Sequence, residues 1–200
     1  DGLTIEFLPL VLLSAPVFAI TAVVFMGLLG KMMDKVDKLT NTPAWPLFLG
    51  AIFCGLMGLW VPGALGLGLD VIPDFLGNNL PVATVVILVT TKLVLTVVCV
   101  GTGLHGGLYL PSLFMGAGVG CLLGKLAAAL GIMSGAGLSL AGMAAVAAAV
   151  FGAPISTVLI IFEFTRSYEA ALLSIIAVTI CTLISHQIYA PSFFDRTIKD

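Results

Sequence analysis

Charged residues are confined to a few short segments of this chain, and long apolar stretches separate them. Asp, Glu, Lys and Arg are absent from Phe7 to Gly30, from Leu39 to Leu69 and from Leu126 to Phe162. About 20 apolar residues are enough for a helix to cross a bilayer. We therefore predict an all-α, polytopic membrane protein. The predicted spans are residues 7–30, 45–61, 80–100, 108–130, a broken pair at 139–163, and 170–188.

Two breaks interrupt this pattern at the depth of the membrane. Residues 101–107 contain four glycines between apolar runs, and Gly152-Ala153-Pro154 divides residues 139–163 into two helices that are each too short to cross. Non-helical backbone at that depth is tolerated only where protein buries it or where it lines a hydrated cavity. Broken helices are typical of transporters, so we expect a site at residues 101–107. The stretch 66–79 is expected to be an outer loop with a short helical turn.

Lysines suggest how the chain is oriented. Lys31, Lys35 and Lys38 follow the first span, and Arg196 and Lys199 lie near the end of the chain. By the positive-inside rule, we expect a cytoplasmic loop at residues 31–42 and a cytoplasmic C-terminus. The predicted location is the inner or plasma membrane.

Composition excludes several classes of function. The chain of 200 residues is 60% hydrophobic and 9% charged, with a formal net charge of −2, whereas about 25% of residues are charged in a soluble domain. So sparse a charge offers no basic surface for nucleic acid. Cys54, Cys99, Cys121 and Cys181 occur singly in apolar runs, so we expect packing residues. We predict no metal site and no cofactor.

The candidate chemistry lies at Gly107-Leu108-Tyr109-Leu110-Pro111, where a new helix is expected to begin. The first N–H groups of a helix lack partners, and the helix dipole places about half a positive charge there. Such an end binds anions. Pro111 in the first turn gives up only an N–H that would be unpaired. The alternative is a glycine-rich hinge between two spans.

Lys92 is a charge inside the span 80–100. A lysine at mid-membrane costs about 2.5 to 3.5 kcal/mol on insertion scales, so it should face protein or water. It then adds positive potential near the pathway. Alternatively, the side chain extends to a membrane interface and keeps its charge in water.

An ordered set of segments identifies a family. These segments are Lys92, Gly106 to Pro111 running into Leu113 to Gly116, Ala141 to Ala145, Ala153 to Ser156 leading to Phe162 to Thr165, and Pro191 to Phe194. Together they resemble the second half of the membrane domain of the CLC family of chloride channels and chloride/proton exchangers. The family's GxFxP signature falls on Gly107 to Pro111, and the resemblance covers essentially the whole chain.

The resemblance implies a fold and a function. The chain would be one half of an inverted-repeat CLC-type fold of tilted and broken helices, and it would require the N-terminal half that this sequence lacks. It would transport chloride or similar small anions as a voltage-gated-type channel or a chloride/proton antiporter, not as an enzyme. Homodimer contacts would run through residues 154–163 and 170–185.

The resemblance also implies the site residues. Backbone amides of Leu108 and Tyr109 would coordinate the anion, with Gly107, Pro111 and Phe194 completing the site and Lys92 adding potential. The chain departs from the family twice. Tyr109 replaces the usual phenylalanine, and Phe194 stands where a tyrosine commonly supplies a hydroxyl. Phe194 either borders the anion or only packs where the last helix meets the cytoplasmic face.

Two other functions are alternatives. Broken helices also serve secondary transporters of organic anions or amino acids. Ser134, Ser139 and His186 raise the possibility of an intramembrane hydrolase, but Gly131 to Gly135 does not match the GxSxG spacing and no partner acid is evident.

Overall fold

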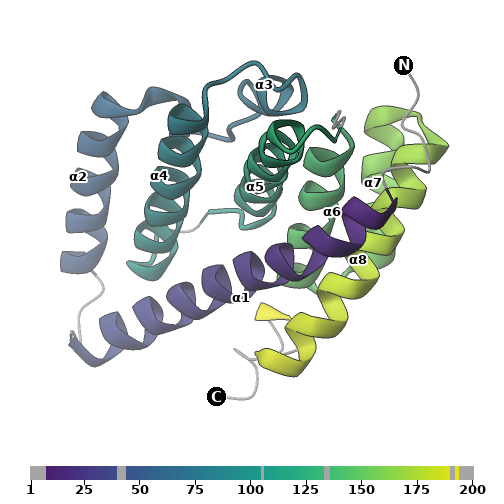
Figure 1. Ribbon diagram of the computed structural model, residues 1–200. Coiled ribbons are helices and arrows are strands. Elements are labelled where there is room, and N and C mark those ends of the chain that lie inside the picture. The colour runs from purple at the N-terminus through teal and green to yellow at the C-terminus, as the bar shows by residue number, and fades with distance from the viewer. Residues whose placement is uncertain (1–7, 40–43, 105, 133–135, 190–191, 194–200) are drawn as a thin grey trace.

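The computed structural model describes residues 8–39, 44–104, 106–132, 136–189 and 192–193. Every regular element in these ranges is helical (Figure 1). The α-helices are α1 (Leu8–Leu39), α2 (Ala44–Trp60), α3 (Ile72–Leu76), α4 (Val82–Gly101), α5 (Tyr109–Ala129), α6 (Gly137–Phe151), α7 (Pro154–Thr165) and α8 (Tyr168–Ile188), and a 3₁₀ turn, η2, covers Pro62–Ala64.

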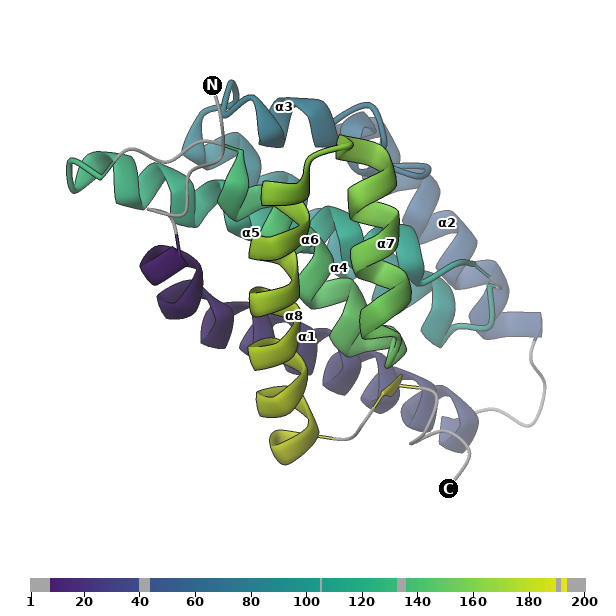
Figure 2. The ribbon, with the colours of Figure 1, turned by 90° about the vertical axis from the view of Figure 1, so that its right-hand side faces the viewer.

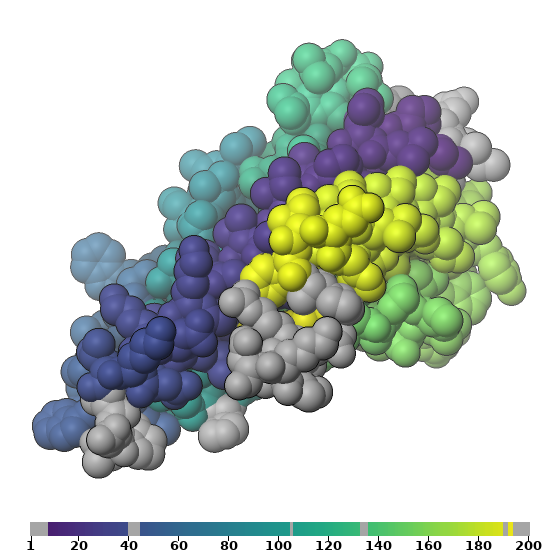
Figure 3. Space-filling model, turned by 90° about the horizontal axis from the view of Figure 1, so that it is seen from below, coloured from purple at the N-terminus to yellow at the C-terminus, as the bar shows by residue number. Residues whose placement is uncertain are grey.

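Helix α6 forms the centre of the molecule. Every residue from Gly137 to Val150 is buried, and five of the seven residues from Ala144 to Val150 are alanines. The helix is covered by α5, α8, α1 and α7. Helices α1 and α8 also pack along each other, as the view from below shows (Figure 3). An apolar helix with small side chains can be enclosed on all sides in this way.

Glycines allow α5 to approach α6 closely. A Cβ at Gly116 would collide with the backbone of Gly142, and a Cβ at Gly120 would collide with the backbone of Leu138. Gly116 and Gly120 share one face of α5 because four residues separate them. Gly118 lies on another face, against Val89. The small residues of α5 therefore serve two helix contacts.

Four helices are long and apolar enough to cross a membrane, namely α1, α4, α5 and α8. Helices α2, α6 and α7 are apolar but shorter, at 17, 15 and 12 residues. Helix α1 has 32 residues, about 48 Å at 1.5 Å per residue. That length exceeds the roughly 30 Å hydrocarbon core, so α1 must tilt or extend beyond it.

The prediction of a loop from residue 31 is wrong, because α1 continues to Leu39. Residues 31–39 contain no Gly or Pro, so nothing stops the helix. Asp34 and Lys38 also have the four-residue spacing that supports a helix through opposite charges. Residues 40–43 lie outside the described ranges.

Both predicted breaks are present. The first separates α4, which ends at Gly101, from α5, which begins at Tyr109. Helix α6 ends at Gly152, which adopts the left-handed conformation at φ 67°, and α7 begins with Pro154 in its first turn. Both residues suit these positions. Glycine tolerates positive φ, and the N–H that proline lacks would have no partner in the first turn of a helix. Helices α7 and α8 then run side by side on one face (Figure 2).

The predicted loop at residues 66–79 contains one short helix. Between α2 and α4 the chain forms only η2 and the five-residue α3.

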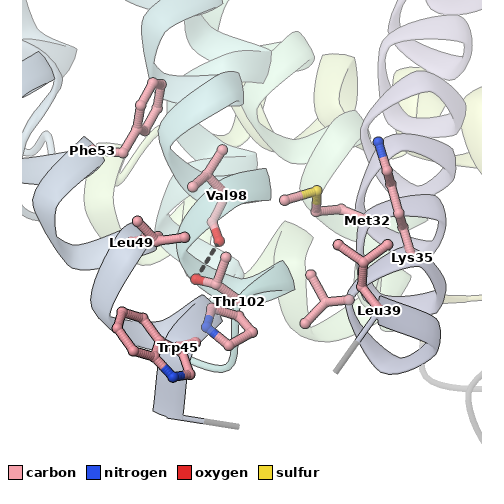
Figure 4. A pocket seen from close by; sticks show the side chains of 11 residues that line it. Met32, Lys35, Leu39, Trp45, Leu49, Phe53, Val98 and Thr102 are labelled. Carbon is pink, nitrogen blue, oxygen red and sulfur yellow. Dashed lines mark hydrogen bonds between the residues drawn. The ribbon is translucent and has the colours of Figure 1, made fainter. Parts of the chain in front are cut away.

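Helix α2 is peripheral and packs mainly on α4 and η2 (Figure 1). A cavity of about 450 Å³ separates it from the end of α1. Met32 and Leu39 of α1, Leu49 of α2 and Val98 of α4 face this space (Figure 4). Lys35 is its one charged residue among those described, so the space is largely apolar.

Candidate functional site

The site is built where α4 ends and α5 begins. Helix α4 closes with N–H groups of Thr102, Gly103 and Leu104 donating to carbonyls of the preceding turn, at 2.9 to 3.1 Å. Gly103 has φ 90°, a conformation that costs glycine little and other residues more. This turn stops α4 abruptly and sends the chain into the glycine-rich loop.

Backbone donors at the start of α5 have no partner among the residues that the structure describes. The first bond of the helix is from the Ser112 N–H to the Leu108 carbonyl, at 3.1 Å. Within the described part of the chain, the N–H groups of Gly107, Leu108, Tyr109 and Leu110 donate to no other residue. Pro111 lies in the first turn and has no N–H. These four amides are thus available at the positive end of the α5 dipole.

These amides adjoin a cavity of about 540 Å³. Gly106, Gly107, Leu108 and Tyr109 line one side of it. The remaining lining residues are Met33 of α1, Val100, Gly103 and Leu104 at the end of α4, Phe151 of α6, and Phe193. None of these described lining residues is charged, so the amides and the helix end dominate the local electrostatics.

Tyr109 is fixed by packing. Its ring lies edge-on to Phe151, with centroids 5.2 Å apart. Its hydroxyl is buried and has no hydrogen-bond partner of normal geometry among the described residues. The ring therefore holds the first residue of α5 in place, while the backbone amide remains available.

Open space lies beside Gly106 and Gly107 at the start of α5. A Cβ built at Gly106 or Gly107 meets nothing within 4 Å. The glycines are thus not required by packing between helices, unlike Gly116. Their effect is to let a ligand reach the backbone, as expected for glycine beside a bound anion.

Lys92 lies behind the loop and is buried, with 3% of its surface exposed. Its ammonium donates to the carbonyls of Ala64 at 3.1 Å and Gly66 at 2.6 Å. It also lies 5.4 Å from the centroid of the Phe114 ring. The interpretation that Lys92 extends to an interface is therefore wrong, because main-chain carbonyls of the segment after η2 already satisfy the charge inside the protein.

A second cavity of about 270 Å³ lies on the Lys92 side of the loop. It shares Gly106 and Gly107 with the larger cavity and is also lined by Leu110 and Pro111. The glycine-rich loop therefore separates two spaces. Leu108 and Tyr109 line only the larger space, Pro111 and Lys92 line only the smaller one, and Gly107 lines both.

Phe193 was not predicted as a site residue. It is 6% exposed and lines the larger cavity, whereas the predicted Phe194 lies outside the described residues. The signal was present in Pro191 to Phe194, where two adjacent phenylalanines allow either to be matched to the family's tyrosine. Tyr189, five residues before Phe194, could be considered as another source of the tyrosine hydroxyl, but its hydroxyl donates to the Met26 carbonyl at 3.1 Å.

The described residues show no hydrolase or metal arrangement. The Ser139 hydroxyl donates to the Phe75 carbonyl at 3.3 Å, which is a packing contact between α6 and α3. Ser134 lies outside the described residues. No three His, Cys, Asp or Glu side chains gather as a potential metal site in the described ranges.

A comparison with known protein families identifies the family of this chain. The family model described as voltage gated chloride channel matches residues 2–186. The chain therefore belongs to the voltage-gated chloride channel (CLC) family.

Individual relatives agree with this assignment. The chain is 33% identical over 184 residues to the H⁺/Cl⁻ exchange transporter ClcA of Cronobacter sakazakii, covering 88% of this chain and 39% of the relative. It is 32% identical over 208 residues to ClcA of Vibrio campbellii, covering 98% and 44%. The chain thus spans about two-fifths of the length of these relatives.

Solved structures share the fold. A slow cyanobacterial Cl⁻/H⁺ antiporter superimposes with a TM-score of 0.87 at 20% identity, covering 99% of this chain and 48% of that one. A CLC-type fluoride/proton antiporter superimposes with a TM-score of 0.74 at 22% identity, covering 94% and 46%. The expected all-α CLC-type architecture is confirmed, and the chain is an integral membrane protein.

Proposed function

We propose that this chain supplies one half of a pathway for chloride or similar small anions in a longer CLC protein. The carrying observation is the set of amides at the start of α5 that have no partner among the described residues, beside a cavity of about 540 Å³ whose described lining residues carry no charge. Neutral amides suit transport because they hold an ion without the strong trapping of a buried cation. The relatives named as H⁺/Cl⁻ exchange transporters favour coupled exchange as the mode of transport.

Flux through the full-length protein tests this function. Reconstituted into liposomes, the full-length protein should carry chloride and move protons in the opposite direction under a chloride gradient. The 200-residue chain alone should give no flux above empty vesicles, because it provides only one side of the site. Robust chloride flux from the isolated chain, or none from the full-length protein, would contradict the proposal.

The proposed pathway has a defined orientation. Lys31, Lys35 and Lys38 lie in the last turns of α1, and the positive-inside rule then assigns that end of α1 to the cytoplasm. The α4 to α5 loop lies near Met33 of the same segment across the larger cavity. The cavity would therefore open toward the cytoplasmic side of the site.

We further propose that α7 and α8 form the contact of a homodimer. Large apolar side chains are exposed along these two adjacent helices, among them Ile155, Leu159, Leu172 and Ile175. Their exposed fractions range from 46% to 76%. A second copy packing on this face would bury it, as the family resemblance implies.

Single cysteines introduced on this face should cross-link. In a full-length background without native cysteines, Leu159→Cys and Leu172→Cys should give disulfide-linked dimers in membranes. Leu13→Cys on α1 is a matched control, since Leu13 is 77% exposed but lies on another helix. Dimers from the control alone would contradict the assignment of the interface.

A hydroxyl placed on the wall of the larger cavity should tighten anion binding. Phe193→Tyr would add a donor there, and a hydrogen bond to a charged acceptor contributes about 1.5 to 3 kcal/mol before the anion's lost hydration is subtracted. We expect chloride affinity to rise about 3- to 10-fold, since about 1.4 kcal/mol is tenfold. Calorimetry on the full-length protein measures this directly.

Phe194→Tyr is the informative comparison, because the sequence motif favours Phe194 and the cavity favours Phe193. A rise in affinity for Phe193→Tyr alone would support the cavity. A rise for Phe194→Tyr alone would restore the sequence-based prediction. Unchanged affinity in both would remove this segment from the site.

A further inference from the structure

Two cysteines that are far apart in the sequence meet behind the glycine-rich loop. Cys54 lies in α2 and Cys99 lies near the end of α4, and their Sγ atoms are 2.7 Å apart. The sequence predicts packing residues for all four cysteines, and in this pair the packing brings two thiols into contact. The separation of 45 positions along the chain hid the contact from sequence reasoning.

The pair differs from the other two cysteines in access and in partners. Cys54 and Cys99 are half-buried and both line the cavity of about 270 Å³. Cys121 and Cys181 are buried, and their thiols contact an Asn78 side-chain oxygen and the Ala145 carbonyl, each at 3.4 Å. A small polar reagent can therefore reach the first pair through the cavity.

The cavity also contains a positive charge. Lys92 is the one charged residue among its described lining residues. Its ammonium is held by the carbonyls of Ala64 and Gly66, so the feature that sets this pair apart is the contact between the two sulfur atoms. Contact between two thiols then favours a disulfide over further oxidation, because a second sulfur is in place to react.

We propose that Cys54 and Cys99 are a redox modification site that forms a reversible disulfide with hydrogen peroxide as oxidant. One thiol attacks the peroxide, its S–O bond forms as the O–O bond breaks, and one water leaves with a sulfenic acid as product. The second thiol attacks that sulfur, the S–S bond forms, and a second water leaves. The two thiols lose two electrons and two protons, and one hydrogen peroxide becomes two waters.

The disulfide would tie a peripheral helix to the site. Helix α2 packs mainly on α4 and η2, and the cavity of about 450 Å³ separates it from the end of α1. A covalent bond from Cys54 to Cys99 would fix α2 to the helix that leads into the glycine-rich loop. Gly106 and Gly107 line the same cavity as the two thiols.

Peroxide treatment of the full-length protein tests the proposal. Reduced protein in liposomes is exposed to hydrogen peroxide, remaining thiols are alkylated, and the digest is analysed by mass spectrometry. We expect a peptide linking residues 54 and 99 that dithiothreitol removes, at least tenfold above the level in Cys54→Ser or Cys99→Ser. Cys121→Ser is the matched control and should form the link as the wild type does.

Thermal unfolding supplies a second reading that does not depend on digestion. The oxidised wild type should unfold at a higher temperature than the reduced protein, because the bond closes a loop of the unfolded chain. Cys54→Ser should show no such difference. Free thiols at both positions after peroxide, sulfinic acid at either, or a link only between two copies of the chain would overturn the proposal.

Discussion

Gly107→Val is expected to lower chloride affinity of the full-length protein at least tenfold while leaving its membrane yield unchanged. A side chain at Gly107 meets no protein atom within 4 Å of its Cβ, so the fold accommodates it. The added methyl groups would instead occupy the space in front of the Leu108 and Tyr109 amides. Loss of one hydrogen bond to a charged ligand costs about 1.5 to 3 kcal/mol, and about 1.4 kcal/mol is tenfold in affinity.

Calorimetric titration of chloride measures this effect, and Gly55→Val is the matched control. A Cβ at Gly55 also meets nothing within 4 Å, but Gly55 lies in α2 and does not line the larger cavity. The control should bind chloride as the wild type does. If Gly107→Val bound chloride with wild-type affinity, residues 101–107 would be only a hinge between two helices and not part of the anion site.

Gly116→Ala is expected to destabilise the protein strongly, although it adds a single methyl group. The new Cβ would collide with the Gly142 backbone of α6, and backbone cannot move aside as a flexible side chain can. Overpacking of this kind costs about 1 to 3 kcal/mol. The measurement is the free energy of unfolding, or the thermal midpoint of the protein in detergent.

Gly55→Ala provides the contrast for this substitution. Alanine is favoured over glycine within a helix by up to about 1 kcal/mol, and no neighbour crowds this position. The control should therefore be as stable as the wild type or slightly more stable. Equal stability of the two variants would show that α5 and α6 do not need their close approach.

The fold was largely predictable because the membrane imposes simple rules on the sequence. Long apolar runs marked the spanning helices, including α4 with Lys92 and α5 with Lys125 inside them, and Gly152 with Pro154 marked the break between α6 and α7. The end of α1 was not predicted correctly, because the charged residues between Lys31 and Lys38 suggested a loop. They are equally compatible with a continuous helix, and α1 runs without interruption to Leu39.

The site was predictable as far as local sequence determines it. Gly107 to Pro111 indicated a helix start with free amides, and α5 begins at Tyr109. Contacts between distant segments could not be read in the same way. The partners of Lys92 are carbonyls 26 and 28 residues earlier, and Phe193 reaches the cavity from beyond the last long helix. These depend on packing that one sequence does not specify.

The position of a bound halide tests the central claim most directly. Crystals of the full-length protein grown with bromide would locate the ion by its anomalous scattering. The account predicts a peak within hydrogen-bonding distance of the Leu108 and Tyr109 backbone nitrogens, in the cavity that Phe193 also lines. Ordered bromide elsewhere in the membrane domain, with these amides left free of any ion, would contradict it.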